Sequence, residues 1–197
     1  MPLVSRLARV KRFVSDGALA VAELQETSKT LGLDPAGVVA VSFASEATDP
    51  SWYPQEDITS ARRMTQVYFR LYLFESKLKR LVESILSQAD RDGWFEHYVP
   101  EPVRKEAARK RAEEGMAKFH AARGSEKLAY LSISDLRRVV EANWVLFESR
   151  LYQKDWALGK LEELRLTRNA MAHMGDVSDD DLIRIDVILR DWNIQTA

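Results

Sequence analysis

Near the C-terminal end of the chain, an arginine and a histidine stand with four residues between them, at Arg168 and His173, and Asn169 directly follows the arginine. A guanidinium is always cationic and offers a fork of donors that matches a phosphate group. An imidazole exchanges a proton close to neutral pH. The pair therefore has the functional groups to bind a phosphate and to move a proton beside it.

The segment that carries this pair has helical spacing of apolar residues over 155–172. Ala157, Leu161 and Leu164 fall within an arc of roughly 60° on that helix, because an α-helix turns about 100° per residue. Arg168 falls inside the same arc. The sequence therefore predicts that Arg168 points toward the interior, where a guanidinium needs a carboxylate, a groove or a subunit interface.

His173 is expected to point about 140° away from Arg168 if the helix stays regular between them. One helix does not easily aim both side chains at a single phosphate. Two arrangements remain open: the helix ends early and His173 turns back, or two copies of the segment meet across a two-fold axis and form one cleft.

Two further polar residues interrupt apolar stripes on other predicted helices. Glu75 falls among Leu71, Val82 and Leu86, and Asn143 falls between apolar residues of a later helix. In one interpretation, Glu75 and Arg168 form a structural ion pair and Asn143 bonds to the backbone. In the other, both contribute to a site, with Glu75 as an accessory carboxylate that orients Arg168 or His173.

The apolar periodicity is helical almost throughout and predicts an all-α, up-and-down helical bundle. The two prolines of the 49–54 segment interrupt it. This break predicts two parts, a helical N-terminal appendage of unknown role at 1–54 and the main domain at 55–197. Within the main domain we expect helices over about 58–88, 103–123, 134–152 and 155–172, and a last one that begins at Ser178 with Asp181 three positions later.

The composition excludes several classes of protein. The 197 residues carry 29 Lys or Arg against 30 Asp or Glu, for a net charge of -1, so a globally basic nucleic-acid binder is excluded. Without cysteine, the chain has no disulfide or zinc–thiolate site, and three histidines leave little for a metal centre. We therefore expect no metal and no cofactor. No apolar run approaches the roughly 18 residues of a membrane helix, and we expect a cytoplasmic protein without membrane partners.

Two charged segments lead to opposite expectations about binding of an anionic partner: one would repel it and the other would attract it. Asp176 and the acidic run 179–181 directly follow the arginine–histidine pair and would repel a polyanion, although acids also suit the first turn of a helix. Residues 101–127 hold eight Lys or Arg against five acids. This surplus predicts either a solvated face of mixed charge or a weakly basic surface for the partner.

The run from Leu161 to Gly175, LEELRLTRNAMAHMG, resembles the signature of the HEPN superfamily, an arginine, four to six residues and a histidine, often with a polar residue after the arginine. The long-helix segment FRLYLFESKLKRLVE, the step at 128–132 and the single helix after the motif resemble HEPN domains of the Swt type. The resemblance extends from about Ile58 to Trp192.

The resemblance implies a metal-independent endoribonuclease that acts as a homodimer with a composite active site. His173 would be the general acid/base, Arg168 would bind the scissile phosphate, and Asn169 would donate to a phosphate oxygen or fix the histidine. The products would be a 2′,3′-cyclic phosphate and a 5′-hydroxyl. The partners implied are RNA, a second copy, and an antitoxin or another protein in a toxin, phage-defence or RNA-processing setting. Since many HEPN domains lack nuclease activity, a non-catalytic module for dimerisation or partner binding is the alternative.

Overall fold

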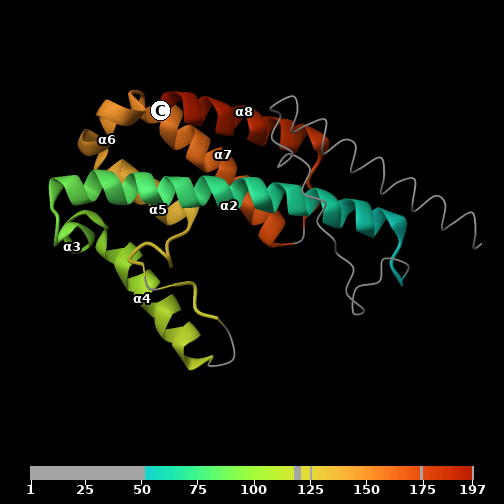
Figure 1. Ribbon diagram of the computed structural model, residues 1–197, viewed down its shortest axis with the longest axis horizontal. Coiled ribbons are helices and arrows are strands. Elements are labelled where there is room, and N and C mark those ends of the chain that lie inside the picture. Colours follow the sequence, from blue (N-terminus) through green and yellow to red (C-terminus); the bar gives the residue numbers. More distant parts are fainter. Residues whose placement is uncertain (1–51, 118–120, 125, 174, 197) are drawn as a thin grey trace, which may run out of the picture. The chain divides into compact units, whose positions relative to one another are not determined.

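The computed structural model describes residues 52–117, 121–124, 126–173 and 175–196 (Figure 1). This part of the chain contains helices and no strand, which confirms the all-α bundle. The helices predicted before residue 52 lie outside the described residues. The helices are α2 (Gln55–Ala89), α3 (Trp94–Tyr98), α4 (Glu101–Met116), α5 (Ile133–Ala142), α6 (Trp144–Leu151), α7 (Lys154–Ala172) and α8 (Asp179–Gln195).

Helix α2 forms because apolar residues recur every three or four positions and give it one buried stripe. The spacing in the sequence predicts that the stripe continues to Leu81 and Ile85. These two residues are half-buried and pack against the core, whereas Val82 and Leu86 are fully buried. A strict seven-residue repeat drifts by about 20° per heptad on a straight helix, so the buried face moves on by one position. The buried residues are Val67, Leu71, Phe74, Leu78, Val82 and Leu86.

Helix α8 lies alongside α2 and runs in the same direction (Figure 1). Hydrogen-bonded side-chain pairs join the two helices. In each pair the α8 residue comes 116 positions after the α2 residue in the sequence, and successive pairs are seven positions apart on each helix. The constant separation fixes a parallel register. Exposed ion pairs contribute about 0–1 kcal/mol each, so they set the alignment more than the stability. The pairs are Arg63–Asp179 at 2.9 Å, Arg70–Asp186 at 2.6 Å and Lys77–Asn193 at 2.7 Å.

The core between these helices is built on Trp192, a fully buried side chain of α8. Its ring meets Phe74 of α2 edge to face, with 5.3 Å between ring centroids, and stacks on Trp156 of α7 at 5.7 Å. Such aromatic pairs stabilise beyond the area they bury. Trp192 therefore joins α2, α7 and α8 at one point.

The structure divides the helix that we predicted over 134–152 into α5 and α6 at Asn143. The Asn143 amide donates to the carbonyl of Val139 in its own helix and to the carbonyl of Tyr98, both at 2.7 Å. A side chain that bonds to backbone groups competes with a regular helix. The prediction of one continuous helix is wrong, because apolar periodicity cannot reveal a bond to a residue 45 positions away.

The turn between α7 and α8 has an ordered boundary on each side. The Gly175 amide donates to the carbonyl of Ala170 at 2.8 Å, the long-range bond of a Schellman helix end. Ser178 caps α8 and forms the predicted capping box with Asp181, whose carboxylate accepts from the Ser178 amide. The pKa of Asp181 is lowered, first by the hydrogen bond from the Ser178 hydroxyl.

Trp192→Ala is expected to lower the free energy of unfolding by about 3–5 kcal/mol, because it opens a cavity where three helices meet. Trp52→Ala is the matched control and should cost little, since the Trp52 side chain is 66% exposed. Denaturant unfolding of the two variants and the parent measures the difference. Equal losses for both variants would contradict the assigned core.

Asp181→Asn is expected to destabilise the protein by about 0.5 kcal/mol near neutral pH, since the exposed carboxylate is partly screened. The lowered pKa means that the charged form contributes stability above the ordinary pKa. This contribution is lost as the pH falls through the folded-state value. The difference between the variant and the parent should therefore begin to shrink near pH 4 and vanish once the pH is below the lowered folded-state pKa. A difference that stays constant from neutral to acidic pH, in thermal unfolding, argues against the capping box.

Candidate functional site

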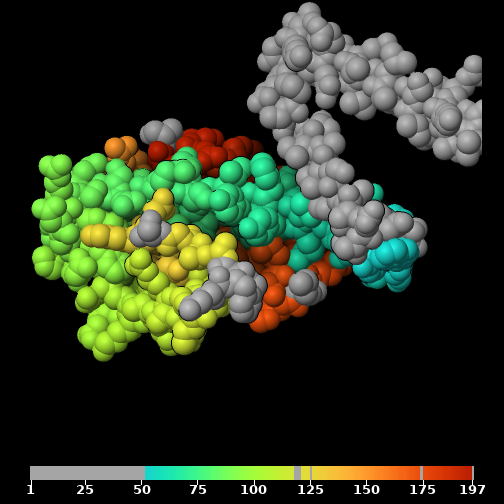
Figure 2. Space-filling model, turned by 60° about the horizontal axis from the view of Figure 1, so that its bottom comes forward, coloured from blue at the N-terminus to red at the C-terminus, as the bar shows by residue number. Residues whose placement is uncertain are grey.

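Arg168 lies in the last turns of α7, where the end of that helix reaches the surface beside α2 (Figure 2). The prediction that Arg168 is directed into the interior is wrong, because its side chain is exposed. The last buried residue of α7 is Leu164, one turn earlier. Arg168 thus continues the core-facing arc of α7 past the end of the core, and its guanidinium is open to solvent.

Arg168 also differs from other arginines of α7 and α8 in its surroundings. Arg165 pairs with Glu162 at 2.6 Å, and Arg184 pairs with Asp181 at 3.5 Å. Among the residues that the structure describes, no carboxylate lies within ion-pair distance of Arg168. A cation without such a partner remains available to an anionic ligand.

His173 is the residue that ends α7. Its amide donates to the carbonyl of Asn169, so α7 is helical up to Ala172, and its imidazole is exposed. Regular geometry between positions 168 and 173 leaves the two side chains about 140° apart. The arrangement in which the helix ends early is therefore excluded for one chain, and Arg168 and His173 of a single copy diverge. Asn169 is half-buried between them.

Glu75 lies apart from the arginine–histidine pair. Its carboxylate contacts the ammonium of Lys79 at 2.8 Å, one turn further along α2. Lys79 in turn lies 3.5 Å from the carbonyl of Ala129, next to α5. The expected pairing of Glu75 with Arg168 does not occur in the chain, so Glu75 is engaged on its own helix.

Asn143 serves the fold. Both hydrogens of its side-chain amide are bonded to backbone carbonyls, which confirms the interpretation that it bonds to the backbone. The sequence-predicted residues thus separate into two groups. Arg168, Asn169 and His173 lie together at the end of α7, whereas Glu75 and Asn143 are held elsewhere.

Three of the four acidic residues that follow the pair are engaged by cations or by the helix cap, whereas Asp180 is exposed. Arg63 of α2 contacts Asp176 at 3.6 Å and Asp179 at 2.9 Å, and Asp181 belongs to the capping box. These bonds reduce the repulsion that the acids would exert on a polyanion. Sequence reasoning missed Arg63, although the seven-residue spacing of Arg63, Arg70 and Lys77 on one face of α2 was the available signal.

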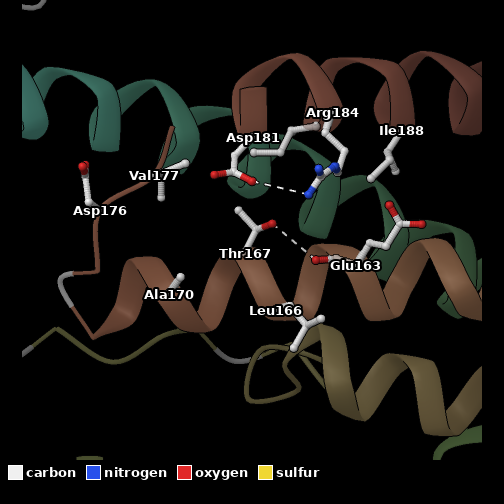
Figure 3. A pocket seen from close by; sticks show the side chains of 10 residues that line it. Glu163, Leu166, Thr167, Ala170, Asp176, Val177, Asp181, Arg184 and Ile188 are labelled. Atoms are coloured by element: carbon white, nitrogen blue, oxygen red, sulfur yellow. Dashed lines mark hydrogen bonds and ion pairs between the residues drawn. The ribbon is translucent and has the colours of Figure 1, made fainter. Parts of the chain in front are cut away.

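A groove of about 240 Å³ runs between α7 and α8 on the side of Thr167 and Ala170 (Figure 3). Its floor is apolar, and Asp181 and Arg184 pair at its edge, at 3.5 Å. The other charged residues that line it are carboxylates, which disfavour a phosphate. Arg168 does not line the groove. The groove is therefore a separate feature and no binding place for RNA. Its carboxylates are Glu163, Asp176 and Asp181.

Ion pairs engage part of the basic residues of the 101–127 segment. Lys105 pairs with Glu101, Arg109 with Glu106, and Arg123 contacts Glu114. These pairs favour the interpretation as a solvated mixed-charge face for the described part of this segment. His120 lies outside the described residues.

Its position beside Trp94 and Tyr98 in the sequence predicts that His97 is a packing residue. This prediction is wrong, because the His97 side chain is 69% exposed. Its Nδ1 lies 2.6 Å from the carboxylate of Asp90. The amide of Gly93 also donates to Asp90, at 3.0 Å. This bond lowers the pKa of Asp90 most, followed by the bond to His97. His97 therefore stabilises the turn after α2.

The described ranges contain neither a cluster of metal-binding side chains nor a helix suited to cross a membrane. No three His, Asp or Glu side chains there gather closely enough to hold a metal ion. No helix there has both the length and the apolar composition that a bilayer crossing requires.

The comparisons with known proteins give one finding. The family described as Swt1-like HEPN matches residues 70–193. This range contains Glu75, Asn143 and the complete run from Arg168 to His173, and it corresponds to the resemblance drawn from the sequence. No curated protein and no solved structure matches the chain.

Asn143→Ala is expected to lower the free energy of unfolding by about 1–3 kcal/mol, because two partly buried hydrogen bonds to backbone carbonyls are lost. Asn169→Ala is the matched control, with an expected loss within about 0.5 kcal/mol. Chemical denaturation of both variants provides the comparison. A stable Asn143→Ala variant would show that Asn143 is not needed for the fold and would return it to the candidate site.

Proposed function

Because the chain belongs to the Swt1-like HEPN family, we propose that it is a metal-independent endoribonuclease in which Arg168 and His173 act on the RNA backbone. One observation carries this proposal. Both residues of the family motif are present and exposed at the end of α7, and among the described residues Arg168 has no carboxylate partner. An exposed guanidinium without a carboxylate partner is open to a phosphate group.

The reaction is a transfer of the phosphodiester from the 5′-oxygen to the neighbouring 2′-oxygen. The imidazole of His173 takes the proton of the 2′-hydroxyl, whose oxygen then attacks the phosphorus. The bond from phosphorus to the 5′-oxygen breaks, and that oxygen receives a proton from a protonated imidazole or from water. The products are a 2′,3′-cyclic phosphate and a 5′-hydroxyl, and no oxidant or metal takes part.

Arg168 binds the non-bridging oxygens of the same phosphate. Its planar fork donates two parallel hydrogen bonds, and its charge stabilises the additional negative charge of the pentacovalent transition state. Asn169 is a neutral donor at the edge of the site. The divergence of about 140° between positions 168 and 173 assigns Arg168 of one copy to His173 of the other, in a homodimer.

The wider setting is part of the same proposal. An RNA-cleaving dimer in the cytoplasm fits a toxin, a phage-defence system or RNA processing, and a toxin would need an antitoxin or another protein partner. We further propose an appendage of unknown role at 1–54 and a catalytic domain at 55–197; α2 begins at Gln55. Growth arrest on expression of the parent, but not of His173→Ala, would favour the toxin setting.

His173→Ala and Arg168→Ala are each expected to reduce RNA cleavage in EDTA by about 10²–10⁴-fold, because each removes a group that acts in the transition state. Arg165→Ala is the matched control. It removes an arginine that lies one turn earlier and is already paired with Glu162, so cleavage should persist. Rates on total RNA and analysis of the 3′ ends of the products measure the effect.

Equal cleavage by the parent and by His173→Ala would contradict the nuclease. The alternative, a non-catalytic module for dimerisation or partner binding, predicts another pattern. Arg168→Ala would then weaken the dimer or lower its stability, His173→Ala would be silent, and neither the parent nor the variants would cleave RNA.

A further inference from the structure

Helix α2 carries a second apolar face besides its buried stripe. Tyr68, Phe69, Tyr72 and Leu73 are between 51% and 59% exposed, and we call these four residues the α2 aromatic face. The rings of Tyr68 and Tyr72 stack with 6.0 Å between centroids. Single exposed apolar residues are ordinary on protein surfaces, but a contiguous group of large ones marks a place of contact.

The geometry of α2 shows where this face points. Tyr68 and Tyr72 each lie about 160° around the helix from Arg70, which bonds to Asp186 of α8. Phe69 and Leu73 each lie about 160° from Leu71, which is buried in the core. The middle of the α2 aromatic face therefore lies about 130° from both Arg70 and Leu71, while Tyr68 borders the core side and Leu73 borders the α8 side.

The arginine–histidine pair belongs to the C-terminal end of α7. In Figures 1 and 2 the C-terminal end of α7 emerges beside α2, on the side away from α8. A contact made by the α2 aromatic face with a second copy thus brings two ends of α7 toward one interface. The site needs this, because Arg168 and His173 of one copy diverge.

We propose that the α2 aromatic face is the surface on which a second copy of the chain packs, and that this contact completes the composite site. The inference rests on the proposed function for the role of the dimer, although the contact itself can be measured without RNA. The four side chains expose on the order of 450 Å², at about 200 Å² for each fully exposed large side chain. This is roughly half of the ~800 Å² that each partner contributes to a stable interface.

The charges of α2 favour a second copy over RNA. Between Met64 and Glu75 the only charged residue is Arg70, and Asp186 holds its guanidinium at 2.6 Å. A polyanion would find no free cation among the four side chains. A contact between two identical faces, in contrast, places no like charges opposite each other among these four side chains. Arg62 and Arg80, both exposed, lie beyond the two ends of the face and suit the polar rim of an interface.

Sedimentation of the full chain without RNA tests the contact. Phe69→Glu and Tyr72→Glu each place a carboxylate on the apolar face and should raise the dissociation constant of the dimer by about tenfold or more. Val145→Glu is the matched control, since Val145 is 78% exposed on α6, and its dimer should match that of the parent. Circular dichroism should show all three variants folded, because the replaced side chains are already exposed.

A second measurement uses the absence of cysteine from the chain. Single cysteines introduced at the four positions of the face are treated with a short bifunctional maleimide. At least one of them, Leu73→Cys being the first choice, should give a covalent dimer, whereas Val145→Cys should not. A covalent dimer from Val145→Cys alone would overturn the proposal.

The outcomes separate this inference from the proposed function. A monomeric parent, or a Phe69→Glu variant that remains a dimer, overturns the inference whether or not RNA is cleaved. A dimeric Phe69→Glu variant with weakened RNA binding would overturn it in favour of RNA as the occupant. A monomeric Phe69→Glu variant that cleaves RNA like the parent supports the contact but contradicts the composite site.

Discussion

Residues five positions apart on a regular α-helix point about 140° away from each other, and α7 remains helical from Arg168 to the residue before His173. This constraint determines how Arg168 and His173 can take part in one site. Two groups that are suited to one phosphate lie on one helix and cannot converge on it from the same copy. A single copy therefore presents an arginine and a histidine as separate exposed groups, and a shared site needs a second copy.

The remaining helices hold the end of α7 in this position. Helix α8 is aligned on α2 by contacts at a constant separation of 116 positions, and Trp192 fastens both to α7. The core of α7 ends at Leu164, so the last two turns are presented at the surface. The same alignment brings Arg63 to Asp176 and Asp179, which reduces negative charge beside the site. The alignment of α8 on α2, the core at Trp192 and the contacts of Arg63 thus together fix the position and the charge surroundings of the C-terminal end of α7.

The sequence was sufficient for the all-α class, for the capping box at Ser178 and for the motif itself, because each depends on residues near one another in the chain. The sequence was not sufficient to predict whether Arg168 is buried. The direction of its side chain followed from helix geometry, but its exposure depends on where the neighbouring helices end. Asn143 and Glu75 show the same limit. The sequence shows that both residues interrupt apolar stripes, but it does not show their partners. The partner of Asn143 is a carbonyl 45 positions away, and the partner of Glu75 is a lysine on the same helix.

The central claim is that Arg168 of one copy works with His173 of another. Mixing Arg168→Ala with His173→Ala, after denaturation and joint refolding, tests it most directly. Half of the dimers formed at random contain one variant of each kind, and each of these restores one of two sites. The account predicts recovery of about a quarter of the parent's RNA cleavage, although neither variant cleaves alone. Failure to recover activity from a mixture that does form mixed dimers would contradict it.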